Sequence, residues 1–453
     1  MKMEELVSYL KNTGYIFQGS EIYGGLANTW DYGPMGSILK NNIKNTWRKA
    51  FVQKITNSFE VDSSILMHPR VWEASGHVDS FTDPMIDCKD CKMRWRADNL
   101  IEQFDKNIDA DGMEIAQLQT YITDHDVKCP NCDSDDFTSV RHFNLMFKTN
   151  RSVTNDEAGV VYLRPENAQG EYVNFANVQR TMRAKIPFSI AQIGKAFRNE
   201  ITPGNFTFRT IEFEQMEHQT FCKPGEDDAW YEHYKTYAMD YVKSLGIEPA
   251  RLRYKPHTQM AHYAKDAIDI DYQFPFGWGE INGTHNRTDF DLVNHEEHSG
   301  QSMHYLDPVT NEKFIPYVVE STFGADRLTL ALLCEAYTKE QLEDGTEREV
   351  MKLIPAIAPY KVAVFPLNKK LHAEKAKEIY KELQNHFMTV YDETASIGKR
   401  YRRQDGVGTP FCITIDDETI NNGTVTLRDR DTMEQIVLKI GEVENYVKER
   451  IVF

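Results

Sequence analysis

The sequence predicts an α+β protein with a separate C-terminal α/β domain. From Phe197 to Phe221, two apolar-rich runs flank a polar loop around Gly204, a pattern typical of a β-hairpin. From Tyr360 onwards, a strand, a helix, further strands and a final helix alternate, as in a compact α/β domain. The chain has 453 residues, enough for about three domains of roughly 150 residues each.

The first strong element is an amphipathic helix over residues 37–54. Leu39, Ile43, Trp47 and Phe51 recur at steps of four residues and form one apolar stripe. A stripe of this kind must be buried, and it is most often buried within its own chain.

Residues 83–140 carry many acidic side chains and are expected to form an insertion that is poor in core residues. Cys88, Cys91, Cys129 and Cys132 form two Cys-x-x-Cys pairs within it. Each pair can supply two corners of a tetrahedron, so the sequence predicts a four-sulfur structural zinc site. The spacer between the pairs is longer than in ordinary zinc ribbons, and four reduced thiols are the alternative.

Two distant segments place arginine beside a turn or a helix start. The predicted hairpin carries Arg198 at the loop entry and Arg209 at its exit, where two guanidinium groups can hold one polyanion. In the segment Val318 to Arg327, a strand ends at Gly324 and a helix begins near residue 326, so that backbone N–H groups and Arg327 meet at a positive helix end. Both arrangements suit a triphosphate, although an internal salt bridge of Arg327 with Asp326 or Glu320 is the alternative.

These segments resemble motifs 2 and 3 of the class II aminoacyl-tRNA synthetases, and the wider wording resembles the homodimeric type of glycyl-tRNA synthetase. The resemblance includes IYGGLANTWDYGPMGSILKNNIKNTW from Ile22, YLRPENAQGEYVNF from Tyr162 and FPFGWGEINGTHNRTDFDL from Phe274. It implies a class II catalytic core over residues 1–337, a mostly antiparallel sheet flanked by helices, with the zinc-binding insertion at 83–140. A linker at 338–354 and an anticodon-binding domain at 355–453 follow. The helix with the apolar stripe stands at motif 1, which implies a homodimer.

The implied activity is that of a glycine–tRNA ligase. ATP, as its Mg²⁺ complex, would react with glycine to give glycyl-adenylate, and the glycyl group would pass to the 3′ end of tRNA-Gly. Such chemistry needs positioning and charge stabilisation rather than a protein nucleophile. Arg198 and Arg327 are the implied catalytic residues. The implied ATP-binding residues are Arg198, Asn199, Glu200, Phe208, Arg209, Phe213, Glu320, Gly324 and Arg327.

Glycine has no side chain to bind, so larger amino acids must be excluded by size, because one methyl group contributes only about 1 to 3 kcal/mol of discrimination. The resemblance implies that carboxylates anchor the ammonium group. The implied glycine-binding residues are Glu166, Arg198, Glu217, Glu280 and Thr322. The apolar neighbours of Glu280 predict that it lies on a buried strand.

Several positions depart from the family wording near these residues. Asn167 and Glu171 stand where the family has a threonine and an aliphatic residue, Ile211 replaces an arginine, and Ser321 and Thr322 replace Pro-Ser. None of these changes removes a predicted phosphate contact. Four histidines in the same half of the chain are expected to be hydrogen-bonded polar residues rather than metal ligands: His285, His295, His298 and His304.

The net charge of −17 argues against indiscriminate binding of nucleic acid. Residues 355–453 contain 15 basic and 15 acidic side chains, so the excess acid lies upstream. Within this neutral part, one short run is the predicted tRNA-binding patch, and a solvated charged face is its alternative. The run contains Lys399, Arg400, Arg402 and Arg403.

No apolar run approaches the ~20 residues of a membrane helix, and the N-terminus lacks the apolar core of a secretory signal. The expected location is therefore the cytoplasm, without a membrane partner. A different class of protein, a non-catalytic synthetase-like paralogue that binds nucleic acid, would be free to lose Arg198, Glu217 or Arg327, and all three are present.

Overall fold

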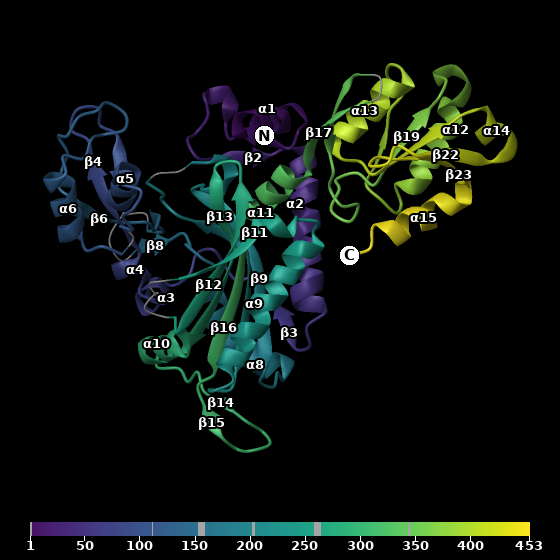
Figure 1. The fold of residues 1–453 in the computed structure, drawn as a ribbon. Coiled ribbons are helices and arrows are strands. Elements are labelled where there is room, and N and C mark those ends of the chain that lie inside the picture. The colour runs from purple at the N-terminus through teal and green to yellow at the C-terminus, as the bar shows by residue number, and fades with distance from the viewer. Residues whose placement is uncertain (1, 111, 153–158, 202–203, 258–263, 343–344) are drawn as a thin grey trace.

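The structure is a computed structural model that describes residues 2–110, 112–152, 159–201, 204–257, 264–342 and 345–453. A large twisted sheet occupies the centre of the molecule (Figure 1). The insertion, drawn in blue, lies on one side of this sheet, and the C-terminal domain, drawn in yellow-green, lies on the other. The expected α+β class, with a synthetase-like core and a C-terminal α/β domain, is confirmed.

The central sheet has seven strands in the order β11-β12-β13-β16-β10-β9-β3. All neighbours are antiparallel except β3 and β9, which are parallel. Strands β9 and β10 form the predicted hairpin, and β16 ends at Gly324 as expected. The strands are β3 (Ser58–Glu60), β9 (Phe188–Phe197), β10 (Glu212–Cys222), β11 (Leu252–Pro256), β12 (Asp266–Phe274), β13 (Gly277–Thr288) and β16 (Tyr317–Gly324).

Helices α2 (Pro34–Trp47), α9 (Asp227–Ser244) and α11 (Ala325–Ala336) supply the core that covers one face of this sheet. The stripe predicted in the first helix is fully buried there; the ring of Phe51, just beyond α2, lies 5.6 Å from His218 and 5.5 Å from Phe323 between ring centroids. The stripe therefore packs within its own chain. The helices cover this face of β10 and β16, and polar side chains occupy the opposite face of the two strands.

Shorter elements complete the core around this sheet. They are α1 (Met3–Asn12), β1 (Ile16–Gln18), β2 (Trp30–Tyr32), α3 (Pro69–Ala74), α4 (His77–Ser80), β7 (Lys148–Asn150), β8 (Val160–Tyr162), α7 (Ala168–Tyr172), α8 (Phe175–Met182), α10 (Phe290–Ser299), β14 (Tyr305–Leu306) and β15 (Lys313–Phe314). The short helix α7 packs against β9 and β10 on the polar face, which brings residues 166–171 close to the carboxylates of the sheet.

The insertion folds as a small unit with its own hydrophobic core. Its three-stranded sheet has the order β5-β4-β6 and packs with two helices around Ile86, Leu100, Ile101 and Leu118, all buried. The expectation of a segment poor in core residues is wrong, because its apolar side chains converge on one cluster. The elements are β4 (Thr82–Asp87), β5 (Arg94–Arg96), α5 (Ala97–Phe104), α6 (Ile115–Asp124) and β6 (Arg141–Asn144).

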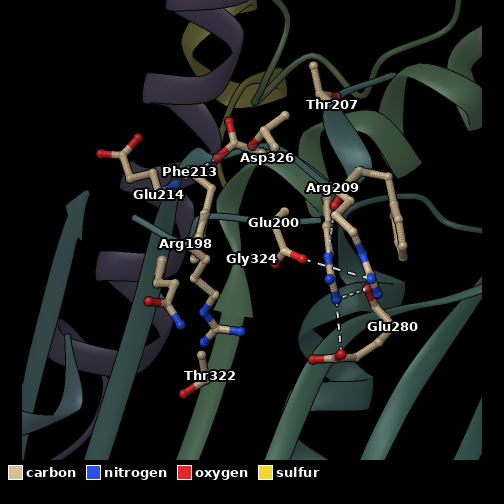
Figure 2. A pocket seen from close by; sticks show the side chains of 14 residues that line it. Arg198, Glu200, Thr207, Arg209, Phe213, Glu214, Glu280, Thr322, Gly324 and Asp326 are labelled. Atoms are coloured by element: carbon tan, nitrogen blue, oxygen red, sulfur yellow. Dashed lines mark hydrogen bonds and ion pairs between the residues drawn. The ribbon is translucent and has the colours of Figure 1, made fainter. Parts of the chain in front are cut away.

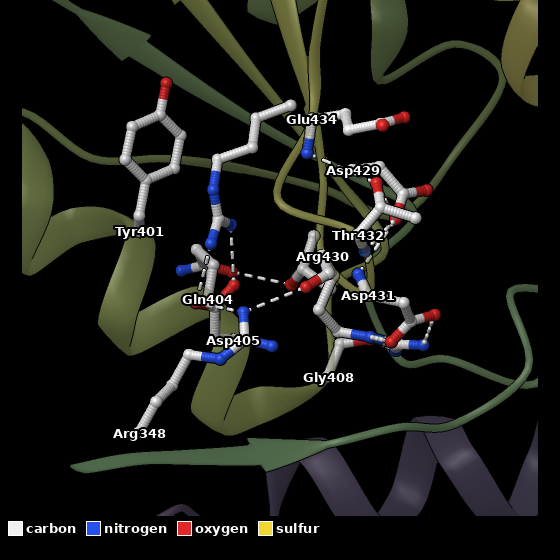
Figure 3. A network of polar contacts seen from close by, with 12 residues as sticks. Arg348, Tyr401, Gln404, Asp405, Gly408, Asp429, Arg430, Asp431, Thr432 and Glu434 are labelled. Atoms are coloured by element: carbon white, nitrogen blue, oxygen red, sulfur yellow. Dashed lines mark hydrogen bonds and ion pairs between the residues drawn. The ribbon is translucent and has the colours of Figure 1, made fainter. Parts of the chain in front are cut away.

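The segment predicted as a linker contains a β-hairpin of β17 (Tyr337–Gln341) and β18 (Glu347–Met351). Arg348 on β18 is buried and donates to Asp405, 3.3 Å away, and Arg428 donates to the same carboxylate at 2.8 Å (Figure 3). This buried network ties the hairpin to the C-terminal domain. A buried carboxylate with two arginine partners makes the connection costly to break.

The C-terminal domain has a five-stranded sheet in the order β20-β19-β21-β22-β23 and a hydrophobic core of its own. Strand β19 pairs with β20 and β21 in parallel, and the other neighbours are antiparallel. The elements are β19 (Val362–Pro366), α12 (Lys369–Leu383), β20 (Thr389–Tyr391), α13 (Ile397–Val407), β21 (Phe411–Ile415), α14 (Asp417–Asn422), β22 (Thr424–Asp429), β23 (Gln435–Lys439) and α15 (Val443–Arg450).

Candidate active site

A cavity of about 110 Å³ opens on the polar side of the central sheet, between the β9–β10 hairpin and the start of α11 (Figure 2). Nine of the residues predicted for ATP or glycine line it, although they come from three separate parts of the sequence. These residues are Arg198, Glu200, Phe208, Arg209, Phe213, Glu280, Thr322, Gly324 and Arg327. The remaining lining residues are Thr207, Thr210, Glu214, Gln215 and Asp326.

Arg198 is held between two aromatic rings. Its guanidinium carbon lies 5.2 Å from the ring centroid of Phe81 and 5.3 Å from that of Phe213, and Nε donates to the carbonyl oxygen of Pro165 at 3.1 Å. Rings on both sides fix the plane of the guanidinium group, while a large part of its donor set faces the cavity. Arg198 is thus preorganised for an anionic oxygen.

Arg209 lies on the other side of Glu200 in Figure 2, with 3.9 Å between its Nη1 and Glu200 Oε2. The two arginines of the hairpin therefore face the same cavity from opposite sides. This is the arrangement that the sequence predicts for binding one polyanion.

Arg327 rests on the ring of Phe208, 4.4 Å from its centroid, and its Nε donates to the carbonyl oxygen of Phe208 at 3.1 Å. Its Nη1 donates to Glu280 Oε2 at 2.9 Å. Arg327 thus forms an internal salt bridge, as the sequence-based alternative expected, but its partner is Glu280 and not Asp326 or Glu320. The expectation of a buried Glu280 is wrong, since its side chain is 46% exposed at the mouth of the cavity.

Asp326 anchors the start of α11 to the rest of the core. Its carboxylate accepts hydrogen bonds of 2.7 Å each from Lys40 Nζ, the Tyr32 hydroxyl and the backbone N–H of Glu214. Burial opposes ionisation, but the charge of Lys40 outweighs it and holds the pKa of Asp326 below its usual range. The motif 1 helix, the hairpin and the helix that carries Arg327 are thereby fixed to one another.

Glu217 on β10 lies opposite Thr322 on β16; Thr322 lines the cavity, whereas Glu217 lies beside it without lining it. Glu217 is 2% exposed; Oε1 accepts only a long bond of 3.4 Å from the backbone N–H of Asn167, and Oε2 has no partner among the described residues. The hydroxyl of Thr322 is also buried and unpartnered within the described chain. Burial, followed by the charges of Glu320 and Glu166, raises the pKa of Glu217 well above its usual value.

The departures Asn167 and Glu171 are both buried beside this pair. The Asn167 amide donates to the carbonyl oxygens of Gly194 and Gln215 at 3.2 Å each, so it ties the start of α7 to both strands of the hairpin. Glu171 is 0% exposed, and neither carboxyl oxygen has a hydrogen-bond partner among the described residues. Burial, then the charge of Glu217, raises its pKa well above the usual range.

Four predicted residues do not line the cavity: Glu217, described above, and Glu320, Glu166 and Asn199. Glu320 is buried deeper in the sheet, where it accepts from His285 Nδ1 at 2.8 Å and from Arg287 at 3.1 Å. Glu166 accepts from Gln169 at 2.9 Å, and the backbone N–H of Asn199 donates to Leu145 O at 2.8 Å. The proposed ATP contact of Glu320 is not supported by this placement, because its oxygens already serve an internal network.

The four histidines expected to be satisfied polar residues do form polar contacts. His285 contacts Glu320, His295 contacts Gln169, His298 contacts the carbonyl of Asn294, and His304 contacts Glu296.

Sequence reasoning missed Phe81, which comes from the edge of the insertion, and Gln215 and Asp326. Gln215 carried a usable signal, because it lies between Phe213 and Glu217 at the strand period of two and must share their face. Phe81 carried none, since its approach to Arg198 depends on how the insertion packs.

The four insertion cysteines lie together. Cys88 Sγ is 3.6 Å from Cys132 Sγ, Cys91 Sγ is 3.7 Å from Cys129 Sγ, and all four sulfur atoms lie within 4.8 Å of one another. Zinc–sulfur bonds of about 2.3 Å place the corners of a tetrahedron about 3.8 Å apart. The donor set and its spacing therefore fit a tetrahedral zinc ion.

The basic run of the C-terminal domain lies on α13 but does not form one surface. Arg400 is only 5% exposed, and its guanidinium donates to the carbonyl oxygens of Pro366 at 2.6 Å and Ala395 at 2.8 Å. Its assignment to a tRNA-binding surface is therefore wrong for this structure. Arg402 and Arg403 line a cleft towards the β17–β18 hairpin. Lys399 and Arg403 are exposed, and Arg403 also donates to Asp392 at 3.0 Å and to the carbonyl oxygen of Thr394 at 2.6 Å.

Comparison with known proteins shows the family to which this chain is related. The tRNA synthetase class II core domain (G, H, P, S and T) matches residues 147–405, an anticodon binding domain matches 361–450, and glycyl-tRNA synthetase insertion domain 1 matches 83–117. A glycine–tRNA ligase of Geobacillus thermodenitrificans is 58% identical over 100% of this chain and 98% of the relative. One from Clostridium acetobutylicum is 54% identical over 99% and 98%.

The chain belongs to the glycyl-tRNA synthetase family. It is accordingly a ligase with a class II synthetase core and a C-terminal anticodon-binding domain. The fold is also similar to a solved structure described as the RNA binding domain of threonyl-tRNA synthetase from Cryptosporidium parvum Iowa II, with a TM-score of 0.66 and 16% identity over 99% of this chain and 98% of that one. Among the described residues, no helix is both long and apolar enough to cross a membrane.

Proposed function

We propose that this protein is a glycine–tRNA ligase that activates glycine with ATP and transfers the glycyl group to the 3′ end of tRNA-Gly, acting as a homodimer in the cytoplasm. The observation that supports this most directly is the cavity itself. Three arginines from two sequence motifs converge on it. Thr322 lines it and pairs across the sheet with Glu217, and Thr322 Oγ1 and Glu217 Oε2 are buried without a partner among the described residues.

In the first step a carboxylate oxygen of glycine attacks the α-phosphorus of ATP, the bond to the bridging oxygen breaks, and pyrophosphate leaves. Arg198, fixed between two rings, would hold the α-phosphate and the glycine carboxylate. Arg209 and Arg327 would hold the phosphate tail. Mg²⁺ bound to ATP supplies further charge neutralisation.

The adenine would lie against Phe213, with Glu200 at its edge. In this arrangement the Phe213 ring serves two purposes, because its other neighbour is the Arg198 guanidinium at 5.3 Å from its centroid. Because the Phe213 ring and Arg198 already order each other, stacking a base on the ring restricts these side chains little further, and the entropic cost of binding is small.

Glycine would place its ammonium group between Glu217, Glu280 and the hydroxyl of Thr322. The first and last of these groups are buried polar atoms in need of a partner, and an ammonium group has three donors. A larger amino acid would have to fit its Cβ where Thr322 carries a methyl group that serine lacks. We propose that this methyl group contributes to the exclusion of alanine.

Two further features belong to the proposal. The insertion would hold a structural zinc ion through its four cysteines, and the C-terminal domain would contact the anticodon arm through Lys399 and Arg403, with Arg402 at the edge of the interdomain cleft.

The deciding experiment is ATP–pyrophosphate exchange with each of the twenty amino acids, followed by aminoacylation of tRNA-Gly. Glycine alone should support both reactions. Exchange with another amino acid would overturn the assignment of glycine, and tRNA binding without any exchange would identify a non-catalytic paralogue.

A further inference from the structure

A second cluster of metal-ligating side chains lies on the central sheet, away from the cysteines. It consists of His257, which directly follows β11, Asp269 on β12 and His285 on β13. One ligand atom of each residue lies within 4.8 Å of the others, and the two imidazole centroids are 5.8 Å apart. The end of β11 and the neighbouring strands β12 and β13 therefore bring two imidazoles and one carboxylate together.

The contact between His257 and Asp269 has an unusual geometry. His257 Nε2 lies 2.9 Å from Asp269 Oδ1, but it is a buried atom without a hydrogen-bond partner among the described residues. The pair thus meets the distance of an ion pair and not the geometry of a hydrogen bond. The two atoms are about 3 Å apart and share no proton. This separation matches that of two neighbouring ligand atoms on one metal ion, which metal–ligand bonds of about 2.0 to 2.2 Å bring to a similar distance from each other.

His285 is oriented from behind. Its Nδ1 contacts Glu320 Oε1 at 2.8 Å, which directs the opposite ring nitrogen towards the cluster. A carboxylate that accepts from the far nitrogen is the usual support of a metal-bound histidine. Glu320 is itself fixed by Arg287 at 3.1 Å and Gln219 at 3.0 Å.

The sheet leaves room at this point because Gly283 lacks a side chain. A Cβ at Gly283 would lie 3.4 Å from His285 Nε2 and 3.5 Å from Asp269 Oδ1. Both ligand atoms thus border the same small space. Gly283 on β13 also pairs with Thr322 on β16, and Thr322 lines the active-site cavity, so this space lies next to that cavity.

We propose that His257, Asp269 and His285 form a binding site for a divalent transition-metal ion of the zinc class. Two imidazole nitrogens and one carboxylate oxygen are a donor set that zinc and its neighbours prefer over Mg²⁺ or Ca²⁺. The site is distinct from the four-cysteine cluster in both position and ligand chemistry. The prediction from sequence that His285 is only a hydrogen-bonded polar residue is then incomplete, because its partners come from strands whose register the sequence does not give.

The test uses full-length protein stripped with a chelator and titrated with Co²⁺, which reports its ligands by absorption. Wild-type protein should bind two equivalents per chain, one with a sulfur-to-cobalt charge-transfer band and one without. A His257→Ala/His285→Ala protein should lose the second and keep the first. A Cys88→Ser/Cys132→Ser protein should show the reverse, and His298→Ala/His304→Ala, which removes two histidines elsewhere, should bind as wild type.

Asp269→Asn keeps the size of the side chain and should weaken the second Co²⁺ equivalent at least tenfold. It guards against a histidine variant that fails to fold, which circular dichroism would reveal. The proposal is overturned if wild-type protein binds one equivalent only and loses it with the cysteines, or if folded His257→Ala/His285→Ala and Asp269→Asn proteins bind the second equivalent as wild type does.

Discussion

Arg327 and Glu280 form an ion pair across the candidate active site, with 2.9 Å between Nη1 and Oε2. In the proposed reaction one of them binds the phosphates of ATP and the other the ammonium group of glycine. Their side chains are 25% and 46% exposed, and such a pair contributes only about 0 to 1 kcal/mol. The pair can therefore be separated easily when the two substrates arrive, and it keeps both charges compensated until then.

Replacing Glu280 by glutamine should raise the KM for glycine about 10- to 150-fold, because one charge-assisted hydrogen bond to the ammonium group is lost. The KM for ATP should stay unchanged or fall, since Arg327 loses its competing partner. Both constants are measured by ATP–pyrophosphate exchange. Glu212→Gln, on the exposed end of β10, is the matched control. An increased KM for ATP with an unchanged KM for glycine would contradict the assigned role.

Glycine binding should become stronger as the pH rises, because the pKa of Glu217 is raised and only its ionised form attracts an ammonium group. Below that pKa the ionised fraction grows tenfold per pH unit, so the KM for glycine should fall by up to about tenfold per unit. Glu217→Gln should raise this KM steeply, leave ATP binding nearly unchanged and remove the pH dependence. A glutamine variant with the wild-type pH profile would refute the role of Glu217.

Glu171→Gln should stabilise the protein at neutral pH. The folded chain keeps Glu171 protonated above about pH 4.5, where the unfolded chain releases that proton, so wild-type stability falls as the pH rises towards the folded pKa. The free energy of unfolding of the variant should exceed that of wild type by about 1.4 kcal/mol more for each pH unit in this range. Denaturant titrations at several pH values test this, with Glu374→Gln on the surface of α12 as control. A constant difference would show that Glu171 ionises normally.

The sequence predicts the framework of the site because the framework depends on local patterns. The hairpin with Arg198 and Arg209 follows from two apolar runs and a polar loop, and the helix start before Arg327 follows from the glycine that ends β16. Each signal is contained within about 25 residues. Side-chain periodicity then places the residues of one strand on one face.

The pairing of charges is less accessible to sequence analysis, because it depends on strand register and on rotamers. Glu280 and Arg327 are far apart in sequence and meet only because β13 and β16 are neighbours. Arg400 looks like its basic neighbours in the sequence, but its position on α13 turns it towards Pro366. His257 and Asp269 meet His285 for the same topological reason, and no spacing in the chain indicates it.

Cys88→Ser should remove the proposed structural zinc and loosen the insertion. Three remaining thiolates leave a tetrahedral ion without one ligand, and metal binding contributes directly to the stability of small metal-bound units. Metal analysis and hydrogen exchange over residues 83–140 measure the two effects. Cys222→Ser, which changes a buried cysteine outside the cluster, is the control for loss of a thiol. Full occupancy of the cysteine cluster in Cys88→Ser would refute the assignment.

Neutralising Lys399 and Arg403 together should weaken tRNA binding and lower its salt dependence by about one unit of slope for each lost phosphate contact. Both side chains are exposed on α13, although Arg403 also pairs with Asp392, whereas Arg400 is buried and is left in place. The control is Lys370→Ala/Lys381→Ala, which removes the same charge from exposed positions of α12. Pyrophosphate exchange needs no tRNA and should survive in both proteins. If exchange collapses in Lys399→Ala/Arg403→Ala while tRNA affinity and its salt slope stay unchanged, this surface supports the catalytic core or the fold rather than the tRNA, and the proposed division of labour between the two domains is wrong.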